Sequence, residues 1–328
     1  MLPQLNKKME KIMPLITPVS VLTGVLLGSH LSGYAYLSPW IFAFMTFSGS
    51  ISSSFKEFVQ VVVQPLPLII TLLILHVLMP LLAMGLGHVV FSSDSFTISG
   101  LILAAAIPTG ITSFVWVAIY RGHIALTLSI ILVDTLLSPF IVPYTMSLLV
   151  GAKVHLDTFG MMKGMLIMVV VPSLIGMMLN QFTQGKIKEQ WSGRLGPFSK
   201  IAMGIVVAIN GSVIAPYLRD INSKLIGLAV FVLFLTALGY VLGWLIAKLM
   251  RWPDDVVVAL TFNGGMRNIS AGAVIAVAYF PAPVAIPVIL CMLFQQSLAS
   301  LFGYLLNKQY ALTKVPGPTS LTARKISS

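Results

Sequence analysis

The sequence predicts an all-α, polytopic membrane protein that crosses the bilayer ten times, with its helices arranged as a 5+5 inverted repeat. Of its 328 residues, 57% are hydrophobic and only 9% are charged, whereas a soluble domain carries about 25% charged residues. Apolar runs of membrane-spanning length follow one another along the chain, and short polar motifs recur in its two halves. This composition excludes a cytosolic enzyme, a disordered chain and, with Cys291 as the single cysteine, a disulfide scaffold.

The apolar runs define the expected transmembrane helices. A helix needs roughly 20 largely apolar residues to cross the hydrocarbon core. Backbone groups in lipid must find hydrogen-bond partners within the protein, which favours helices. The predicted spans are 12–30, 36–54, 65–91, 98–120, 123–150, 158–182, 198–217, 224–249, 255–280 and 282–307.

The positions of the basic residues predict the orientation. Cytoplasmic loops of membrane proteins are enriched in Lys and Arg. Most of the 20 Lys and Arg residues lie in segments on the same side of the membrane as the N-terminus. We therefore expect a multi-pass protein of the cell inner membrane with both termini in the cytoplasm. This distribution explains the net charge of +11 without a nucleic-acid partner. The predicted divisions are a cytoplasmic N-terminus (1–11), repeat one (12–150), repeat two (151–307) and a cytoplasmic tail (308–328).

The internal repeat is predicted from three weak matches that share nearly the same sequence spacing. Secondary transporters often contain two inverted halves. Because five is an odd number of spans, the two halves must have opposite orientations. The matching segments are 17–20 with 171–173, 48–50 with 210–212, and 109–113 with 264–268.

Two of the predicted spans contain helix-breaking residues followed by polar side chains. Pro108 lacks an amide hydrogen and Gly110 tolerates unusual backbone angles, so the helix can open there. The run 263–265 (Asn-Gly-Gly) offers the same break in the ninth span. Broken backbone at membrane depth is tolerated where it is buried or lines a cavity, and it can bind ions or substrates. The alternative is a pair of ordinary glycine kinks used for packing. The candidate binding residues near the breaks are Thr109, Thr112, Ser113, Asn263, Arg267, Asn268 and Ser270.

Asp134 and Arg267 are the charged residues that fall near the middle of predicted spans. A charge at the bilayer centre costs about 2.5 kcal/mol or more, so it is expected to be paired and to face the protein interior. We expect Asp134 and Arg267 to pair across the two halves, or Arg267 to contact an anionic substrate. The alternative is a static ion pair with no role in transport.

Three further polar residues are possible site residues. His76, four residues before Pro80, is interpreted either as a proton relay or as a core histidine with satisfied hydrogen bonds. Gln295 and Gln296 either line the cavity or form hydrogen bonds between helices. The sequence contains no nucleotide-binding glycine loop and no His-Glu-x-x-His motif, so neither an ATP-driven pump in a single chain nor a metalloprotease is expected.

The motifs around the breaks resemble those of the bile acid:sodium symporter family. The run 108–113 (Pro-Thr-Gly-Ile-Thr-Ser) resembles Pro-Gly-Gly-Thr-Ala-Ser-Asn, and 121–127 (Arg-Gly-His-Ile-Ala-Leu-Thr) resembles Arg-Gly-Asn-x-Ala-Leu-Ser. The run 265–268 (Gly-Met-Arg-Asn) resembles Glu-x-Gly-Met-Gln-Asn. The resemblance extends to about residue 307. It implies a secondary active transporter with a panel domain (spans 1, 2, 6 and 7) and a core domain (spans 3–5 and 8–10). Helices 4 and 9 would cross at mid-membrane, and the substrate would be a bile-acid-like, pantoate-like or other carboxylate.

The sequence departs from the family at the positions that the resemblance assigns to sodium. Ser113 matches the family's serine and Thr127 replaces a serine, so these two with Asn263, in place of a glutamate, are the candidate sodium ligands. Arg267 stands in place of a glutamine, and its positive charge opposes cation binding. We therefore expect Arg267 to act as a fixed internal cation balanced by Asp134, with transport either proton-coupled or facilitative. The remaining departures are Phe114 for asparagine, Ile131 for threonine and Leu75 for glutamine.

Other functions are considered beside this one. An arsenite-type efflux carrier of the same superfamily is an alternative, although the cysteine that such carriers place near the first break is absent. A non-transporting membrane receptor is an alternative of another class, and an enzyme is not expected. No cofactor is expected, sodium is left open, and the substrate, the direction of transport and the oligomeric state are not predicted.

Overall fold

The computed structural model describes residues 16–52, 65–92, 94–150, 157–218 and 222–310. Every named element in these ranges is helical, and the one extended pairing among them is an isolated bridge between Thr109 and Arg267. The predicted cytoplasmic N-terminus at 1–11 and residues 311–328 of the predicted tail lie outside the described residues. The all-helical class predicted from the composition is confirmed for the described part of the chain.

Six helices in the described ranges are long and apolar enough to cross a membrane, so the protein is a multi-pass membrane protein. They coincide with the predicted third, fifth, sixth, seventh, eighth and tenth spans. Three of them contain a turn of π-helix, labelled η3 (Ile74–Leu78), η4 (Leu166–Val170) and η5 (Lys188–Ser192). The six helices are Pro65–Val90, Ile124–Val150, Thr158–Phe182, Lys188–Leu218, Ser223–Leu249 and Ala282–Tyr310.

The N-terminal region differs from the two separate spans predicted at 12–30 and 36–54. A helix over Ile16–Leu26 is bent by 90° relative to the helical segment Gly28–Ser50, and the two together could form one further span. The polar residues around Ser29 do not form an irregular loop, because the chain stays helical through α2 (Gly28–Leu31), η1 (Ser32–Leu37) and α3 (Ser38–Ser50).

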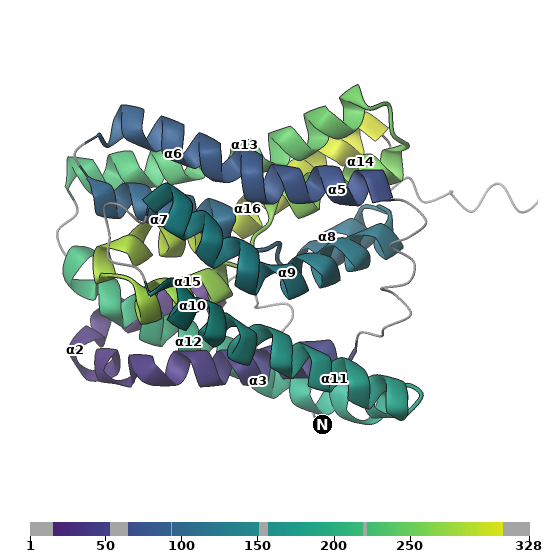
Figure 1. Cartoon of the computed structure of the whole chain (residues 1–328), viewed down its shortest axis with the longest axis horizontal. Helices are drawn as coiled ribbons and strands as arrows, with labels where there is room; N and C mark the ends of the chain where they lie inside the picture. The colour runs from purple at the N-terminus through teal and green to yellow at the C-terminus, as the bar shows by residue number, and fades with distance from the viewer. Residues whose placement is uncertain (1–15, 53–64, 93, 151–156, 219–221, 311–328) are drawn as a thin grey trace, which may run out of the picture.

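The helices pack as two groups, which Figure 1 shows as a lower and an upper layer. In the lower group, α3 packs against α11 and α12, and α12 also contacts α2. In the upper group, α13 packs against α14 and α16, and α7 packs against α6 and α16. The groups meet where α10 contacts α9 and where α15 contacts α3 and α12. The bounds are α5 Pro65–Leu73, α6 Met79–Val90, α7 Ser95–Ala106, α8 Ser113–Ile119, α9 Ile124–Val150, α10 Thr158–Met165, α11 Val171–Phe182, α12 Gly193–Leu218, α13 Ser223–Leu249, α14 Asp254–Gly265, α15 Ile269–Tyr279, η6 Ala282–Val284 and α16 Ala285–Tyr310.

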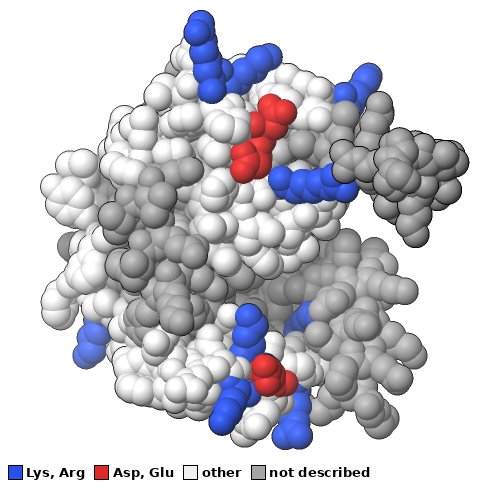
Figure 2. Space-filling view, turned by 90° about the vertical axis from the view of Figure 1, so that its right-hand side faces the viewer, with Lys and Arg blue, Asp and Glu red and all other residues white. Residues whose placement is uncertain are grey.

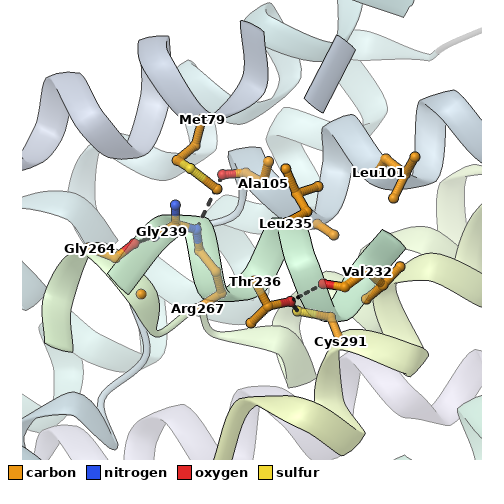
Figure 3. A pocket seen from close by; sticks show the side chains of 12 residues that line it. Met79, Leu101, Ala105, Val232, Leu235, Thr236, Gly239, Gly264, Arg267 and Cys291 are labelled. Carbon is orange, nitrogen blue, oxygen red and sulfur yellow. Dashed lines mark hydrogen bonds between the residues drawn. The ribbon is translucent and has the colours of Figure 1, made fainter. Parts of the chain in front are cut away.

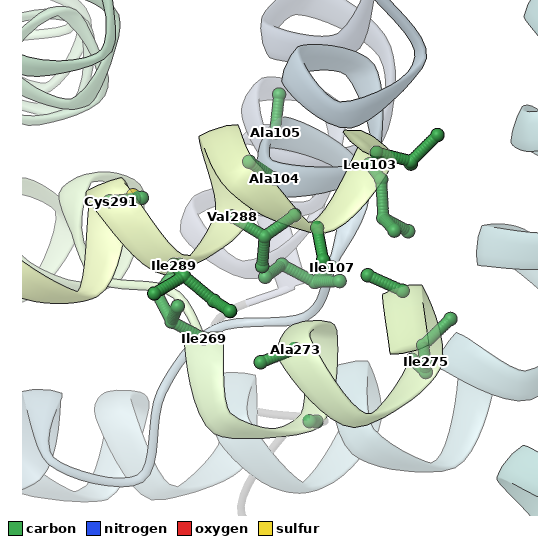
Figure 4. Close-up of a cluster of buried hydrophobic side chains, with 14 of the residues drawn as sticks. Leu103, Ala104, Ala105, Ile107, Ile269, Ala273, Ile275, Val288, Ile289 and Cys291 are labelled. Carbon is green, nitrogen blue, oxygen red and sulfur yellow. The ribbon is translucent and has the colours of Figure 1, made fainter. Parts of the chain in front are cut away.

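A buried apolar cluster joins α7, α15 and α16 in the upper group (Figure 4). Ile107, the first residue after α7, is fully buried in it, and Ala273 of α15 and Val288 of α16 are buried beside it. These side chains give the C-terminal end of α7 a fixed position against α15. The cluster thereby holds the ends of two short helices whose breaks form the site described below.

Asp94 caps the start of α7 at one end of the molecule. Its carboxylate accepts hydrogen bonds from the Thr97 amide (3.0 Å) and hydroxyl (2.6 Å), and Lys224 at the start of α13 lies 2.8 Å away. Burial tends to raise the pKa of Asp94, but the hydrogen bonds from Lys224 and Thr97 prevail and the pKa is lowered. The ionised carboxylate is therefore the form that stabilises the folded protein.

Replacing Asp94 with alanine is expected to lower the free energy of unfolding by about 1 kcal/mol, the usual effect of losing an N-cap. Because the folded pKa lies below the unfolded one, the contribution of Asp94 is present above the unfolded pKa and is lost as the pH falls through the folded pKa. Thermal unfolding of the detergent-solubilised protein at neutral and acidic pH measures this. Lys224→Met, which keeps the cap, should lose less than Asp94→Ala at neutral pH; an equal loss would contradict the capping role.

Candidate functional site

Two helices in the upper group are interrupted: the first at the predicted residues, and the second directly after the predicted run 263–265, which stays helical. The first interruption runs from Ile107 to Thr112, between α7 and α8, and contains Pro108. The second runs from Met266 to Asn268, between α14 and α15. Each leaves main-chain groups without helical partners, and buried groups of this kind must be satisfied elsewhere.

The two interruptions satisfy each other through main-chain hydrogen bonds. The Asn268 amide donates to the Pro108 carbonyl at 2.8 Å, and the Gly110 amide donates to the Met266 carbonyl at 3.3 Å. A Cβ at Gly110 would lie 2.8 Å from the Arg267 carbonyl oxygen, so glycine permits this close approach. The Thr109 hydroxyl also lies 3.1 Å from the carbonyl oxygens of Asn263 and Met266. The interruptions therefore form one hydrogen-bonded crossing.

Asp134 of α9 reaches this crossing from the side. Its carboxylate is fully buried, and one oxygen accepts a 2.6 Å hydrogen bond from the Thr109 amide. The other oxygen lies 2.5 Å from Nε2 of His76, which is located in the π-helical turn η3. The His76 Nδ1 atom is buried and has no hydrogen-bond partner among the described residues. Asp134 is therefore paired with a histidine and a backbone amide.

The predicted ion pair between Asp134 and Arg267 does not form in the described part of the structure. Arg267 instead donates from Nε to the Ala105 carbonyl at 3.2 Å and from Nη1 to the Gly264 carbonyl at 3.0 Å. The physical reason is that α7 and α14 both end beside the guanidinium. The last turn of a helix presents carbonyl groups without helical partners and a partial negative charge, so the two helix ends take the place of the carboxylate.

A small cavity adjoins the guanidinium. It has a volume of about 20 Å³ and is lined by residues of α6, α7, α13, α14 and α16, including Met79, Leu101 and Cys291. Figure 3 shows Arg267 between Ala105 and Gly264 at this cavity. The Nη2 atom is buried without a hydrogen-bond partner among the described residues. A cavity of this size holds about one water molecule, so the guanidinium, 4% exposed, has no room beside it for an organic anion.

A second group of side chains lies on the other side of α14. The Ser113 hydroxyl donates to Oδ1 of Asn263 at 3.1 Å, and Nδ2 of Asn263 donates to the Thr127 hydroxyl at 3.1 Å and to the Ala259 carbonyl at 2.8 Å. Ser113, Thr127 and Asn263 are each fully buried. The side-chain amide of Asn263 thus links α8 to α9 by hydrogen bonds to Ser113 and Thr127.

The remaining predicted residues take three different positions. Gln295 accepts a 2.8 Å hydrogen bond from the Arg267 amide and so belongs to the crossing, whereas Gln296 accepts from the indole of Trp116 at 3.1 Å, a contact between helices. Asn268 caps α15 through the Ala271 amide at 3.3 Å. Thr112, Asn268 and Ser270 are partly exposed, unlike the other predicted residues near the breaks.

Sequence reasoning missed the groups that actually bind Arg267 and Asp134. The carbonyls of Ala105 and Gly264 and the amide of Thr109 are main-chain groups, which leave no signal in residue identity. The sequence predicts His76 only as a possible site residue. Its spacing of four from Pro80 was the available signal, because the missing Pro80 amide leaves the His76 carbonyl without its usual helical donor.

Comparisons with known proteins identify the family of the chain. The family described as Sodium Bile acid symporter family matches residues 39–221. The protein YbaS of Bacillus subtilis is 54% identical over 296 residues, which cover 90% of this chain and 97% of YbaS. The sodium-dependent transporter YocS of the same organism is 25% identical over 260 residues, 76% of this chain and 79% of YocS. A probable chloroplastic sodium/metabolite cotransporter of Oryza sativa, BASS1, is 29% identical over 194 residues, 59% of this chain and 47% of that protein. The chain therefore belongs to the sodium bile acid symporter family of membrane transporters.

Proposed function

We propose that this protein is a secondary transporter that moves a small organic anion across the inner membrane by alternating access, without binding sodium. Family membership supports transport of a small molecule. The independence from sodium rests on one observation: at both positions where the resemblance places sodium ligands, N–H groups of the protein donate to the available oxygen atoms, the Thr127 hydroxyl at the first and the Ala105 and Gly264 carbonyls at the second.

The first of these positions is the chain Ser113–Asn263–Thr127. A sodium ion needs several oxygen ligands and is favoured by a carboxylate, as hard cations generally are. The neutral amide of Asn263 stands where relatives have a glutamate, and its Nδ2 points at the Thr127 hydroxyl and the Ala259 carbonyl. The amide hydrogens thus lie where a cation would lie.

The second position is occupied by the guanidinium of Arg267. Its N–H groups bind the carbonyls of Ala105 and Gly264, which end α7 and α14. A sodium ion about 4 Å from this charge would be repelled by about 4 kcal/mol at an effective dielectric constant of 20. A fixed cation therefore replaces an exchangeable one.

We place the substrate at the partly exposed edge of the crossing. Thr112, Asn268 and Ser270 lie there, and the partial positive charge at the start of α15 favours a negative group. Ile111 of the first interruption faces α3, with its Cδ1 4.0 Å from where a Cβ of Gly49 would lie. An anion at this edge would sit between the two helix groups. Arg267 would then act on it through its charge, and the direct contact considered from the sequence would not be made.

We propose a ten-span inverted repeat as the frame for this function. The two interrupted helices occupy corresponding places in the proposed halves 12–150 and 151–307, and we assign the lower and upper groups of Figure 1 to a panel and a core domain. Figure 2 shows one end of the molecule with Lys and Arg side chains along its upper and lower edges and fewer acidic ones. We propose that this end faces the cytoplasm, as the distribution of basic residues predicts.

The melting temperature of the purified protein is expected to stay the same when sodium chloride is replaced with choline chloride at equal ionic strength. This replacement should equally leave uptake of radiolabelled pantoate or taurocholate into proteoliposomes unchanged. A sodium ion bound at 100 times its Kd would stabilise the protein by about 2.7 kcal/mol. A rise of melting temperature in sodium, or uptake that requires sodium, would overturn the proposal.

A further inference from the structure

We propose that His76 and Asp134 form the binding site for a coupling proton, which is taken up with each monovalent substrate anion. This inference rests on the proposed function and names its coupling ion. The atom that receives the proton is Nδ1 of His76, which is buried without a partner among the described residues.

The hydrogen bonds define the resting state of the pair. An ionised carboxylate only accepts hydrogen bonds. Asp134 already accepts one from the Thr109 amide, and it accepts a second from Nε2–H of His76. A neutral imidazole with its hydrogen on Nε2 carries a lone pair on Nδ1. That lone pair is the basic site, and the imidazolium formed there would stay hydrogen-bonded to Asp134.

The buried charges set the number of protons. Among the described residues, Asp134 and Arg267 are the buried members of the Asp, Glu, Lys and Arg classes. With neutral His76 their charges sum to zero. A monovalent anion at the crossing would leave one uncompensated negative charge in a poorly solvated region, which is costly. One proton on His76 restores neutrality, so the empty and the fully loaded carriers are both neutral.

The pair is connected to the substrate region through the protein. Asp134 binds the Thr109 amide inside the first interruption, and Thr112 at its far end lies at the proposed substrate edge. His76 sits in a π-helical turn, a feature that is frequent at functional sites. The protonation state of His76 can therefore act, through Asp134 and Thr109, on the segment that we place beside the anion.

The elements packed against His76 offer few competing charges. Neither α5 nor α7 contains a titratable side chain, and the carboxylate of α9 is Asp134 itself. On α6, His88 contacts the Met84 carbonyl near the helix end. On α13, the Tyr240 hydroxyl donates to the Gln295 carbonyl, whereas Lys224 and Lys248 lie near the two ends of the helix. The permanent charge near the pair is that of Arg267, which interacts with Asp134 through its charge and not through a hydrogen bond.

The test combines a site measurement with a transport measurement. In NMR spectra of protein labelled at its five histidines, the signal that disappears in His76→Gln should titrate as the imidazole takes up its proton. That titration should shift in Asp134→Asn and stay unchanged in the control His88→Gln. A His76 signal that does not titrate overturns the proton site whatever the protein transports.

In sodium-free proteoliposomes, an inward proton gradient should accumulate pantoate or taurocholate about tenfold for each unit of pH difference, since one proton moves with each anion. A membrane potential should have no effect on this neutral process. His76→Gln should lose the accumulation, and His88→Gln should keep it. Accumulation by His76→Gln, or dependence on the potential, overturns the coupling. If neither anion crosses the membrane although His76 titrates as expected, the proposed substrate class fails and the proton site stands.

Discussion

Replacing Arg267 with methionine is expected to abolish anion transport and to lower the stability of the purified protein. Methionine fills a similar volume but cannot donate to the carbonyls of Ala105 and Gly264. Each buried carbonyl left without a donor costs about 1–3 kcal/mol. The loss of the positive charge would in addition leave Asp134 as an uncompensated buried carboxylate. Thermal unfolding in detergent and uptake in proteoliposomes measure the two effects.

Two further variants separate the charge of Arg267 from its shape. Arg267→Lys keeps the charge but not the planar fork that reaches two carbonyls, so it should retain more stability than Arg267→Met. The double variant Asn263→Glu with Arg267→Gln introduces the residues that the family resemblance places at these positions, and it should gain stability in sodium over choline. Equal stability of Arg267→Met and wild type, or a double variant indifferent to sodium, would contradict the role of a fixed cation.

Replacing Gly243 with alanine is expected to destabilise the protein and to reduce transport. Its Cβ would lie 2.4 Å from the Leu260 carbonyl oxygen on α14, and a backbone atom cannot rotate away as a side chain can. Overpacking of this kind costs about 1–3 kcal/mol. Moving α14 would also displace Asn263 and the carbonyl of Gly264, both of which belong to the site.

Gly227 in the same helix α13 is the matched control, because nothing lies within 4 Å of its Cβ position. Gly227→Ala should raise stability by up to about 1 kcal/mol, the difference between glycine and alanine in a helix. Melting temperatures of the two variants in the same detergent provide the comparison. If both variants shift in the same direction and by the same amount, the close contact between α13 and α14 does not matter for stability.

The sequence was sufficient to predict the helical class and the location of both interruptions. The long apolar runs dictate helices, Pro108 and Gly110 lie inside the first break, and the pair Gly264–Gly265 ends the helix just before the second. The first two predicted spans were less accurate, because the direction changes by 90° at Leu27 while residues 28–37 stay helical. Gly28, Gly33 and Pro39 lie in or beside this stretch, yet they form no irregular loop.

The candidate site was predicted as a set of residues but not as a set of contacts. Thr109, Asp134, Asn263, Arg267 and Gln295 do converge on the crossing, as polar groups in an apolar chain must to find partners. Their pairing was wrong for Asp134 and Arg267. Their opposite charges suggest an ion pair when only the sequence is known. In the fold, His76 binds Asp134, whereas the ends of α7 and α14 bind Arg267.

The hydrogen bonds that run in both directions between the two interruptions have a mechanical consequence. Gly110 donates to Met266 and Asn268 donates to Pro108, so neither interrupted helix can slide or turn without its counterpart. These bonds hold the two interruptions together, so we expect α7, α8, α14 and α15 to move as one rigid body. In an alternating-access cycle this rigid body would carry the bound substrate past the lower group of helices. The interface between the lower and upper groups would then be the surface along which they slide.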